Sequence, residues 1–244
     1  MSKITSFGKS DIGLKRSTNE DAFIVKPEQD FLALADGMGG EAAGEVASQI
    51  FIDSALTVFS KGESHSEQET LKWVQDAFSL ANEKISSHVK RNPEHAGMGC
   101  TAELIAFYDE KFILGHVGDS RTYLLRQGRL RRLTRDHSLI QDQINQGLIT
   151  PVEARRHSLR NVILRAVGAE ETLSIDLVRG ECLPGDLFLL CSDGLTDLVE
   201  DASIQEVLSR SLDLSQKVER LIQLAKSAGG YDNITVILCE VMPS

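Results

Sequence analysis

Four aspartates lie beside short apolar segments that are typical of buried strands. Asp36 ends FLALAD, Asp193 ends FLLCSD, Asp119 follows GHVG, and Asp232 precedes the apolar segment NITVILC. A lone charge at the end of a core strand is unfavourable unless a positive group meets it. Any one of these sites could be an ordinary turn, because Asp-Gly and Asp-Asn are common turn dipeptides. Their repetition favours one shared site.

Clustered carboxylates repel one another unless cations neutralise them. Oxygen ligands without a His or Cys quartet suit Mg²⁺ or Mn²⁺ better than zinc. The glycines after Asp36 and Asp193 let the backbone approach closely enough for a carbonyl to serve as a ligand. Two divalent ions can share a water, lower its pKa and direct it at a phosphorus atom. The predicted chemistry is therefore metal-assisted phosphoester hydrolysis.

Such a site also needs a cation for the phosphate oxygens, and Arg16 is the candidate. It stands beside Asn19, Glu20 and Asp21, so an ordinary surface ion-pair cluster is an equally good explanation of that segment alone. The glycine loop after Asp36 lacks the lysine and the spacing of a nucleotide-binding loop. His116 lies in an apolar segment that is typical of core, and His137 lies in a polar loop.

Composition narrows the class of protein. The chain has 244 residues, 41% of them hydrophobic and 25% charged, with a formal net charge of −10. The acidic balance argues against nucleic acid or an anionic membrane as a partner. The N-terminal segment lacks the apolar stretch of a signal peptide, and no segment is apolar enough to span a membrane. The four cysteines are scattered, which favours reduced buried thiols. We expect a cytoplasmic monomer.

Hydrophobic periodicity predicts the elements that position these residues. Helical spacing runs from about Gly44 to Phe59 and from about Leu71 to Val89, and two further helices are expected before the last strand, one beginning at a Ser203/Glu206 capping pair and one ending at Gly229. Strands are expected at 4–13, 22–25, 31–35, 101–108, 111–117, 121–126, 161–167, 173–177, 187–191 and 234–241.

A polar segment interrupts the strands at about 136–160 and reads as a surface flap, with Thr150, Pro151 and Glu153 opening a short helix as a capping box. Strands and helix pairs are segregated along the chain, which favours an α+β fold with mainly antiparallel sheets over a doubly wound fold. Two stacked sheets, each covered by helices, would make a layered sandwich. We found no linker, so we expect one domain over residues 1–244.

Seven motifs, in order along nearly the whole chain, resemble those of the metal-dependent (type 2C-like) PPM serine/threonine phosphatases. They are RSTNED, ADGMGG, GCTA, HVGDSR, LTRDHS, CSDGLTD and GGYDNITV. The chain length and the flap resemble the compact bacterial members. The resemblance implies a four-layer αββα sandwich, with two stacked sheets flanked by helix pairs.

The resemblance also implies roles for individual residues. Asp36 would bridge two Mn²⁺ or Mg²⁺ ions, and the Gly37 carbonyl would bind one of them. The remaining implied roles are metal binding by Asp193 and Asp232, a contact through water by Glu20, a third ion at Asp119 with Asp193, and phosphate binding by Arg16. A hydroxide bridging the two ions would attack phosphoserine or phosphothreonine without a phosphoenzyme.

Met38 departs from the eukaryotic members, which have a histidine proposed as general acid at this position. Because Met cannot donate a proton, another group must protonate the leaving oxygen, and His137 is one candidate. A partner kinase is expected from the resemblance. Two alternatives stay open: a non-catalytic phosphoprotein-binding module on the same fold, and a two-metal hydrolase of other phosphoesters, such as a nuclease or a small-molecule phosphatase.

Overall fold

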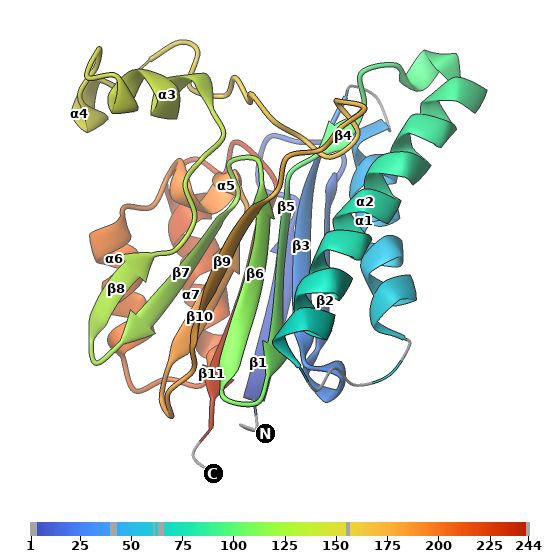
Figure 1. Ribbon diagram of the computed structural model, residues 1–244. Helices are drawn as coiled ribbons and strands as arrows, with labels where there is room; N and C mark the ends of the chain where they lie inside the picture. The colour runs from blue at the N-terminus through green and yellow to red at the C-terminus, as the bar shows by residue number, and fades with distance from the viewer. Residues whose placement is uncertain (1–3, 40–42, 61, 63–65, 155–156, 243–244) are drawn as a thin grey trace.

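The computed structural model describes residues 4–39, 43–60, 62, 66–154 and 157–242. Two antiparallel sheets stack face to face in it (Figure 1). The first has the strand order β1-β11-β10-β7-β8. Its strands are β1 (Ile4–Asp11), β7 (Arg121–Arg126), β8 (Arg129–Arg132), β10 (Leu187–Cys191) and β11 (Ile234–Val241).

The second sheet has the order β2-β3-β5-β6-β9, with a short strand, β4, paired to β3. Its strands are β2 (Asp21–Lys26), β3 (Phe31–Met38), β4 (Gly99–Cys100), β5 (Ala102–Tyr108), β6 (Lys111–Val117) and β9 (Asp176–Glu181). The chain crosses between the sheets at the turn after β6, because β6 belongs to this sheet and β7 to the other.

A helix pair covers the outer face of each sheet (Figure 1). Helices α1 (Ala43–Phe59) and α2 (Glu67–Arg91) pack on the second sheet, whereas α6 (Asp201–Ser209) and α7 (Leu214–Ser227) pack on the first. A short helix, α5 (Asp193–Thr196), follows β10, and 3₁₀ turns occupy Pro27–Gln29 and Pro93–His95. The predicted four-layer αββα sandwich is confirmed.

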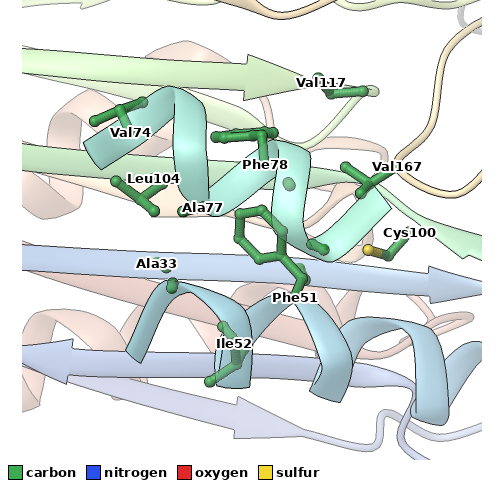
Figure 2. Packing of buried hydrophobic residues seen from close by; sticks show 14 of the residues in the cluster. Ala33, Phe51, Ile52, Val74, Ala77, Phe78, Cys100, Leu104, Val117 and Val167 are labelled. Atoms are coloured by element: carbon green, nitrogen blue, oxygen red, sulfur yellow. The ribbon is translucent and has the colours of Figure 1, made fainter. Parts of the chain in front are cut away.

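Alternation along each central strand produces three apolar clusters. In β5, Leu104 and Ala106 face α1 and α2, while Ile105 and Phe107 face the other sheet. Figure 2 shows the helix-side cluster, in which the rings of Phe51 from α1 and Phe78 from α2 meet edge to face at 5.0 Å. Burial on both faces explains why the central strands read as nearly continuous apolar runs.

The flap contains α3 (Leu139–Asn145) and α4 (Pro151–Ala154) and stands apart from the sandwich, at the end opposite the two termini (Figure 1). The predicted capping box is confirmed: the Glu153 carboxylate accepts from the Thr150 backbone N–H at 2.7 Å, and the Thr150 hydroxyl accepts from the Glu153 N–H at 3.3 Å. Residues 155–156 of the predicted flap lie outside the described residues, as does Gly40 of the ADGMGG motif. The single domain over 1–244 stays a prediction.

Three predicted boundaries were wrong. Residues 161–167 are not a strand: only isolated bridges, Cys100 with Val167 and Ser138 with Ile163, form there. The strand expected at 173–177 lies at Asp176–Glu181, paired with β6. Helix α6 begins after Glu200 and contains Ser203, so Ser203 is not its N-cap.

All four cysteines are free and buried, as the scattered spacing predicts. Among the described residues, none of the helices combines the length and the apolar character needed to cross a bilayer.

Candidate active site

The four predicted aspartates lie at strand ends of the same half of the sandwich. Asp36 is near the end of β3, Asp119 is in the turn between β6 and β7, and Asp193 opens α5 directly after β10. Asp232 lies two residues before β11. Both sheets therefore contribute carboxylates, and Figure 1 shows the ends of β3 and β6 with α5 near the flap side of the molecule.

The charges of these carboxylates act on one another and raise their pKa values. Burial raises the pKa of Asp36 well above its usual value, and the charges of Asp21, Asp193, Asp119 and Asp232 raise it further. The pKa of Asp193 is raised in the same way, by burial first and by Asp119 next. Burial also raises the pKa of Asp119 to about 7, with contributions from Asp136 and Asp197. The fold brings these charges near one another, and their use as one shared metal site stays a prediction.

Thr101 links Asp36 on β3 to the turn that carries Asp119. Its backbone N–H donates to the Asp36 carbonyl at 2.8 Å, and its hydroxyl accepts from the Asp36 N–H at 3.2 Å. The same hydroxyl lies 2.7 Å from the hydroxyl of Ser120, which follows Asp119. Asp36 and the Asp119 turn are thus held in register through one buried side chain.

Glycines allow the backbone at Asp36 to approach its neighbours. A Cβ on Gly37 would lie 2.1 Å from the Gly44 carbonyl oxygen and 2.7 Å from that of Glu20. The Gly37 N–H donates to the Glu20 carbonyl at 3.1 Å. Glu20 therefore sits against the Asp36–Gly37 peptide, where the resemblance implies a metal ligand.

Arg16 lies at the rim of the acidic site. Its Nη2 is 2.7 Å from Asp232 Oδ2, and its Nη1 is 4.0 Å from Glu20 Oε2. Its side chain stays about half exposed, at 48%. The surface ion-pair explanation of RSTNED is thus partly right, since Arg16 does pair with Glu20, but the second partner belongs to the predicted ligand set.

Sequence reasoning missed two residues of the site. Asp21 has a buried Oδ1; its Oδ2 accepts from Ser192 at 2.9 Å and from Thr235 at 2.6 Å, and desolvation raises its pKa to about 6. Asn233 accepts from the Glu20 N–H at 2.8 Å and donates to the Ile12 and Thr18 carbonyls. Both lie inside motifs that were quoted, but nothing in their spacing separates them from their neighbours.

The donors fit a divalent cation by their chemistry. Oδ1 of Asp21, Asp119 and Asp193 is buried in each case without a hydrogen-bond partner among the described residues. Unsatisfied buried carboxylate oxygens are the hard ligands that Mg²⁺ and Mn²⁺ take. In the part of the chain that the structure describes, no three His, Cys, Asp or Glu side chains already stand at metal-ligand spacing. The fit thus rests on donor type and burial, and the metal roles of Glu20, Asp36, Gly37, Asp119, Asp193 and Asp232 stay predictions.

A pocket of about 730 Å³ opens beside the acidic site, between the flap and α5–α6. Asp119 and Asp193 line it, together with Ile140, Ile144 and Arg160 of the flap. Arg160 Nε lies 3.7 Å from Asp197 Oδ2, so the flap contacts the end of α5 across this pocket.

His137 does not suit the role of general acid. Its Nδ1 accepts the Gly118 N–H at 3.1 Å, and its Nε2 lies 3.2 Å from Asp176 Oδ2. Both ring nitrogens are engaged, Nδ1 by the backbone N–H beside Asp119 and Nε2 by Asp176, and burial, followed by the charge of His116, lowers the pKa of His137. The interpretation of His137 as proton donor is therefore not supported.

The family model described as protein phosphatase 2C matches residues 14–228. The chain is 42% identical over 234 residues to the serine/threonine protein phosphatase PstP of Mycobacterium tuberculosis, covering 96% of this chain and 44% of PstP. The chain thus spans about half the length of that relative. It is 33% identical to protein phosphatase PhpP of Streptococcus pneumoniae, covering 95% of each chain.

Solved structures agree with these relatives. A crystal structure of M. tuberculosis PstP superimposes with a TM-score of 0.92 at 39% identity, covering 98% of this chain and 99% of that one. The catalytic domain of PstP in complex with two manganese ions gives a TM-score of 0.90 at 38% identity, with the same coverage.

Proposed function

Because the chain belongs to the protein phosphatase 2C family, we propose that it hydrolyses phosphoserine and phosphothreonine in proteins with the help of two divalent ions, Mn²⁺ or Mg²⁺. The observation that carries the proposal is the acidic cluster contributed by both sheets, with buried oxygens on Asp21, Asp119 and Asp193 that have no hydrogen-bond partner among the described residues. A cluster of this kind is unfavourable for folding alone, which is typical of a functional site.

We assign the ligands by the order of the matched motifs. Asp36 would be shared by both ions, the Gly37 carbonyl would hold one of them, Asp193 and Asp232 would hold the other, and Asp119 with Asp193 would hold a weaker third. When bound, such ions lower the pKa of a shared water and neutralise charge on the phosphoryl oxygens. Glu20 directly precedes β2 and would contact an ion through water; the Asn233 side chain holds its backbone N–H in place.

Arg16 would bind the phosphoryl group. Its guanidinium already lies beside Asp232, and its 48% exposure leaves donors facing solvent, from which a substrate arrives. A planar fork of N–H donors suits two phosphate oxygens at once and favours the charge that spreads over them during transfer. Positioning and electrostatics are the main contributions that a protein makes to phosphoryl transfer.

The flap would contact the rest of the phosphoprotein. We expect the segment 141–160 to make this contact, because Gln141, Ile144, Ala154 and Arg160 line the pocket that Asp119 and Asp193 also line. Loops on a rigid scaffold commonly carry specificity. Shortening this segment is expected to slow the hydrolysis of a phosphoprotein more than that of a small aryl phosphate.

We further propose that the chain acts on a Ser/Thr kinase or its substrates in signalling, as a monomer in a bacterial cytoplasm. The bacterial relatives named as Ser/Thr phosphatases support a phosphorylated protein as the substrate, and the four buried free thiols agree with a reducing compartment.

The direct test is release of phosphate from a phosphothreonine peptide by purified protein, with Mn²⁺, with Mg²⁺ and after chelation. We expect turnover only with a divalent ion. In Asp193→Asn we expect the turnover rate to fall by at least about 100-fold, because a neutral amide holds the ion less tightly than a carboxylate and the ion activates the water. Turnover that survives chelation would refute the proposal. Tight peptide binding without turnover at saturating Mn²⁺ would instead favour the non-catalytic module, and faster turnover of nucleotides would favour a small-molecule hydrolase.

A further inference from the structure

The turn that carries Asp119 is the point where the chain passes from one sheet to the other, between β6 and β7. Gly118 has a φ of +109°, and a Cβ there would lie 2.5 Å from the Cβ of Thr101. The turn is thus pressed against Thr101, which lies between β4 and β5. Its backbone conformation is one that residues with a side chain rarely adopt, which accounts for a glycine at this position.

Glu103 connects the two strands on either side of this turn. It lies on β5, fully buried, on the face of the sheet that packs against the other sheet. One carboxylate oxygen contacts His116 Nδ1 on β6, and the other accepts the hydroxyl of Thr122 on β7. A single side chain therefore holds the strand that enters the turn and the strand that leaves it.

His116 extends this contact toward the flap. Its Nε2 donates to the Arg135 carbonyl at 2.9 Å, two residues before His137. Burial lowers the pKa of His116, but the charge and hydrogen bond of Glu103 outweigh burial, and the net pKa is raised. The rings of His116 and His137 lie 4.6 Å apart.

His137 holds the turn itself, through both its backbone and its ring. Its N–H donates to the Gly118 carbonyl at 2.7 Å, and its Nδ1 accepts the Gly118 N–H at 3.1 Å. Because Nδ1 accepts, we assign the ring proton to Nε2, which faces Asp176. The His137 carbonyl accepts the Leu164 N–H at 2.7 Å, so the two arms of the flap meet at this residue.

We propose that Glu103, His116 and His137 are positioning residues that hold the Gly118–Asp119 turn and couple Asp119 to the start of the flap at 135–137. A buried ion pair contributes little net stability compared with apolar residues of equal volume, so its use here for conformational specificity is a hypothesis about this protein. The inference rests on the proposed function, because it takes Asp119 as the ligand of the weaker third ion.

The test uses a matched pair of variants at position 137. In His137→Asn the amide oxygen takes the place of Nδ1 and keeps the acceptor for the Gly118 N–H, whereas His137→Leu removes it. Calorimetric Mn²⁺ titration of the full chain, without substrate, separates the tight sites from the weakest one. We expect His137→Leu to weaken only the weakest site, by about tenfold or more, and His137→Asn to stay within about threefold of the wild type.

Two further measurements distinguish positioning from general stability. Amide exchange at the Gly118–Asp119 turn should become faster in His137→Leu and stay slow in His137→Asn. Adding Asp119→Asn to His137→Leu should weaken Mn²⁺ binding no further than Asp119→Asn alone, since both changes act on one site. Glu103→Gln, which can donate to His116 and accept from Thr122, should match the wild type, whereas Glu103→Leu should resemble His137→Leu.

The proposal is overturned if the Leu variants fold and bind Mn²⁺ as the wild type does, or if they weaken all sites equally with additive effects. Loss of folding in both Leu variants, together with equal Mn²⁺ binding in His137→Asn, His137→Gln and wild type, would also overturn it, since Gln cannot place its oxygen at Nδ1. These measurements use no phosphorylated substrate, so a failed phosphatase assay leaves the result readable.

Discussion

Asp21 lies directly opposite Asp36 in the ladder between β2 and β3. Like charges at opposed positions of an antiparallel pair destabilise a sheet. Burial raises the pKa of both carboxyls, and Asp21 is held in place by the hydroxyls of Ser192 and Thr235, which come from the other sheet. The contact that joins the two sheets at the site is therefore also the one that concentrates negative charge there.

Replacing Asp36 by Asn is expected to separate stability from function. The neutral amide removes a buried charge, so the melting temperature in chelator should stay equal or rise by a few degrees, about 2–4 °C for each kcal/mol. The increase in melting temperature that Mn²⁺ gives the wild type should be largely lost, because binding to the folded state stabilises it. Activity should fall by about 100-fold or more.

Calorimetry with and without Mn²⁺ measures both effects, and Asp76→Asn on α2, whose carboxylate pairs with Lys72, is the matched control. An Asp36→Asn protein that Mn²⁺ stabilises as strongly as it stabilises the control would contradict the ligand assignment.

Arg16 provides a test of phosphate binding that leaves the fold intact. Its ion pairs are half exposed and are worth at most about 1 kcal/mol of stability, so Arg16→Ala should melt within about 2 °C of the wild type. We expect kcat/KM to fall by about 10- to 100-fold, with Arg16→Lys intermediate because an ammonium group cannot make the two-pronged contact. Competitive inhibition by inorganic phosphate should weaken in parallel; unchanged inhibition in Arg16→Ala would place the phosphate elsewhere.

Much of the fold follows from local patterns in the sequence. Continuous apolar runs ending in Asp-Gly predicted β3 and β10, and the Thr150/Glu153 spacing predicted the start of α4, because each depends on neighbouring residues only. The segment 161–167 was misread, since its apolar residues serve the return arm of the flap, where Leu164 bonds to His137 and Val167 to Cys100. Instead of pairing as a strand, these residues form single hydrogen bonds with separate partners.

The site was predictable in its aspartates but not in the groups that hold them. The motifs predicted Asp36, Asp193 and Asp232, because a carboxylate beside a core strand is conspicuous in a sequence. Glu103 and His116 were not connected, since they are cross-strand partners thirteen residues apart on β5 and β6, and a pairing register is not visible in one sequence. Asn233 was passed over as a turn residue for the same reason: its partners, Ile12 and Thr18, are distant in the chain.

The ion pair between Asp11 and Lys226 is expected to give a pH-dependent contribution to stability. Burial alone would raise the pKa of Asp11, but hydrogen bonds from Lys226 and from the Gly13 N–H outweigh it, so the net pKa is lowered from 3.8. A carboxyl with a lowered pKa in the folded state stabilises the protein above its unfolded pKa, and this stabilisation is lost as the pH falls through the folded pKa.

Lys226→Met keeps the apolar stem and removes the charge. At pH 7 we expect a loss of about 1 kcal/mol in the free energy of unfolding, declining below pH 4 toward zero as Asp11 is protonated. Urea denaturation of both proteins between pH 7 and pH 3 measures the difference directly. An equal loss across this range would show that the lysine acts through packing and not through charge.

Gly37 tests whether the close approach of backbones at Asp36 is needed for the site. A Cβ would lie 2.1 Å from the Gly44 carbonyl oxygen, a fixed backbone atom, so Gly37→Ala must displace either the end of β3 or the start of α1. We expect a loss of more than about 2 kcal/mol in stability, as for other overpacked cores, and weaker Mn²⁺ binding because the Gly37 carbonyl moves with the strand.

Gly128→Ala is the control: it meets open space and has a φ of +76°, so it carries backbone strain alone, about 1 kcal/mol. Chemical denaturation and Mn²⁺ titration of both variants compare the two effects. Equal losses of stability with unchanged Mn²⁺ affinity in Gly37→Ala would show that the site tolerates movement of this peptide, and that the carbonyl is not among the ligands.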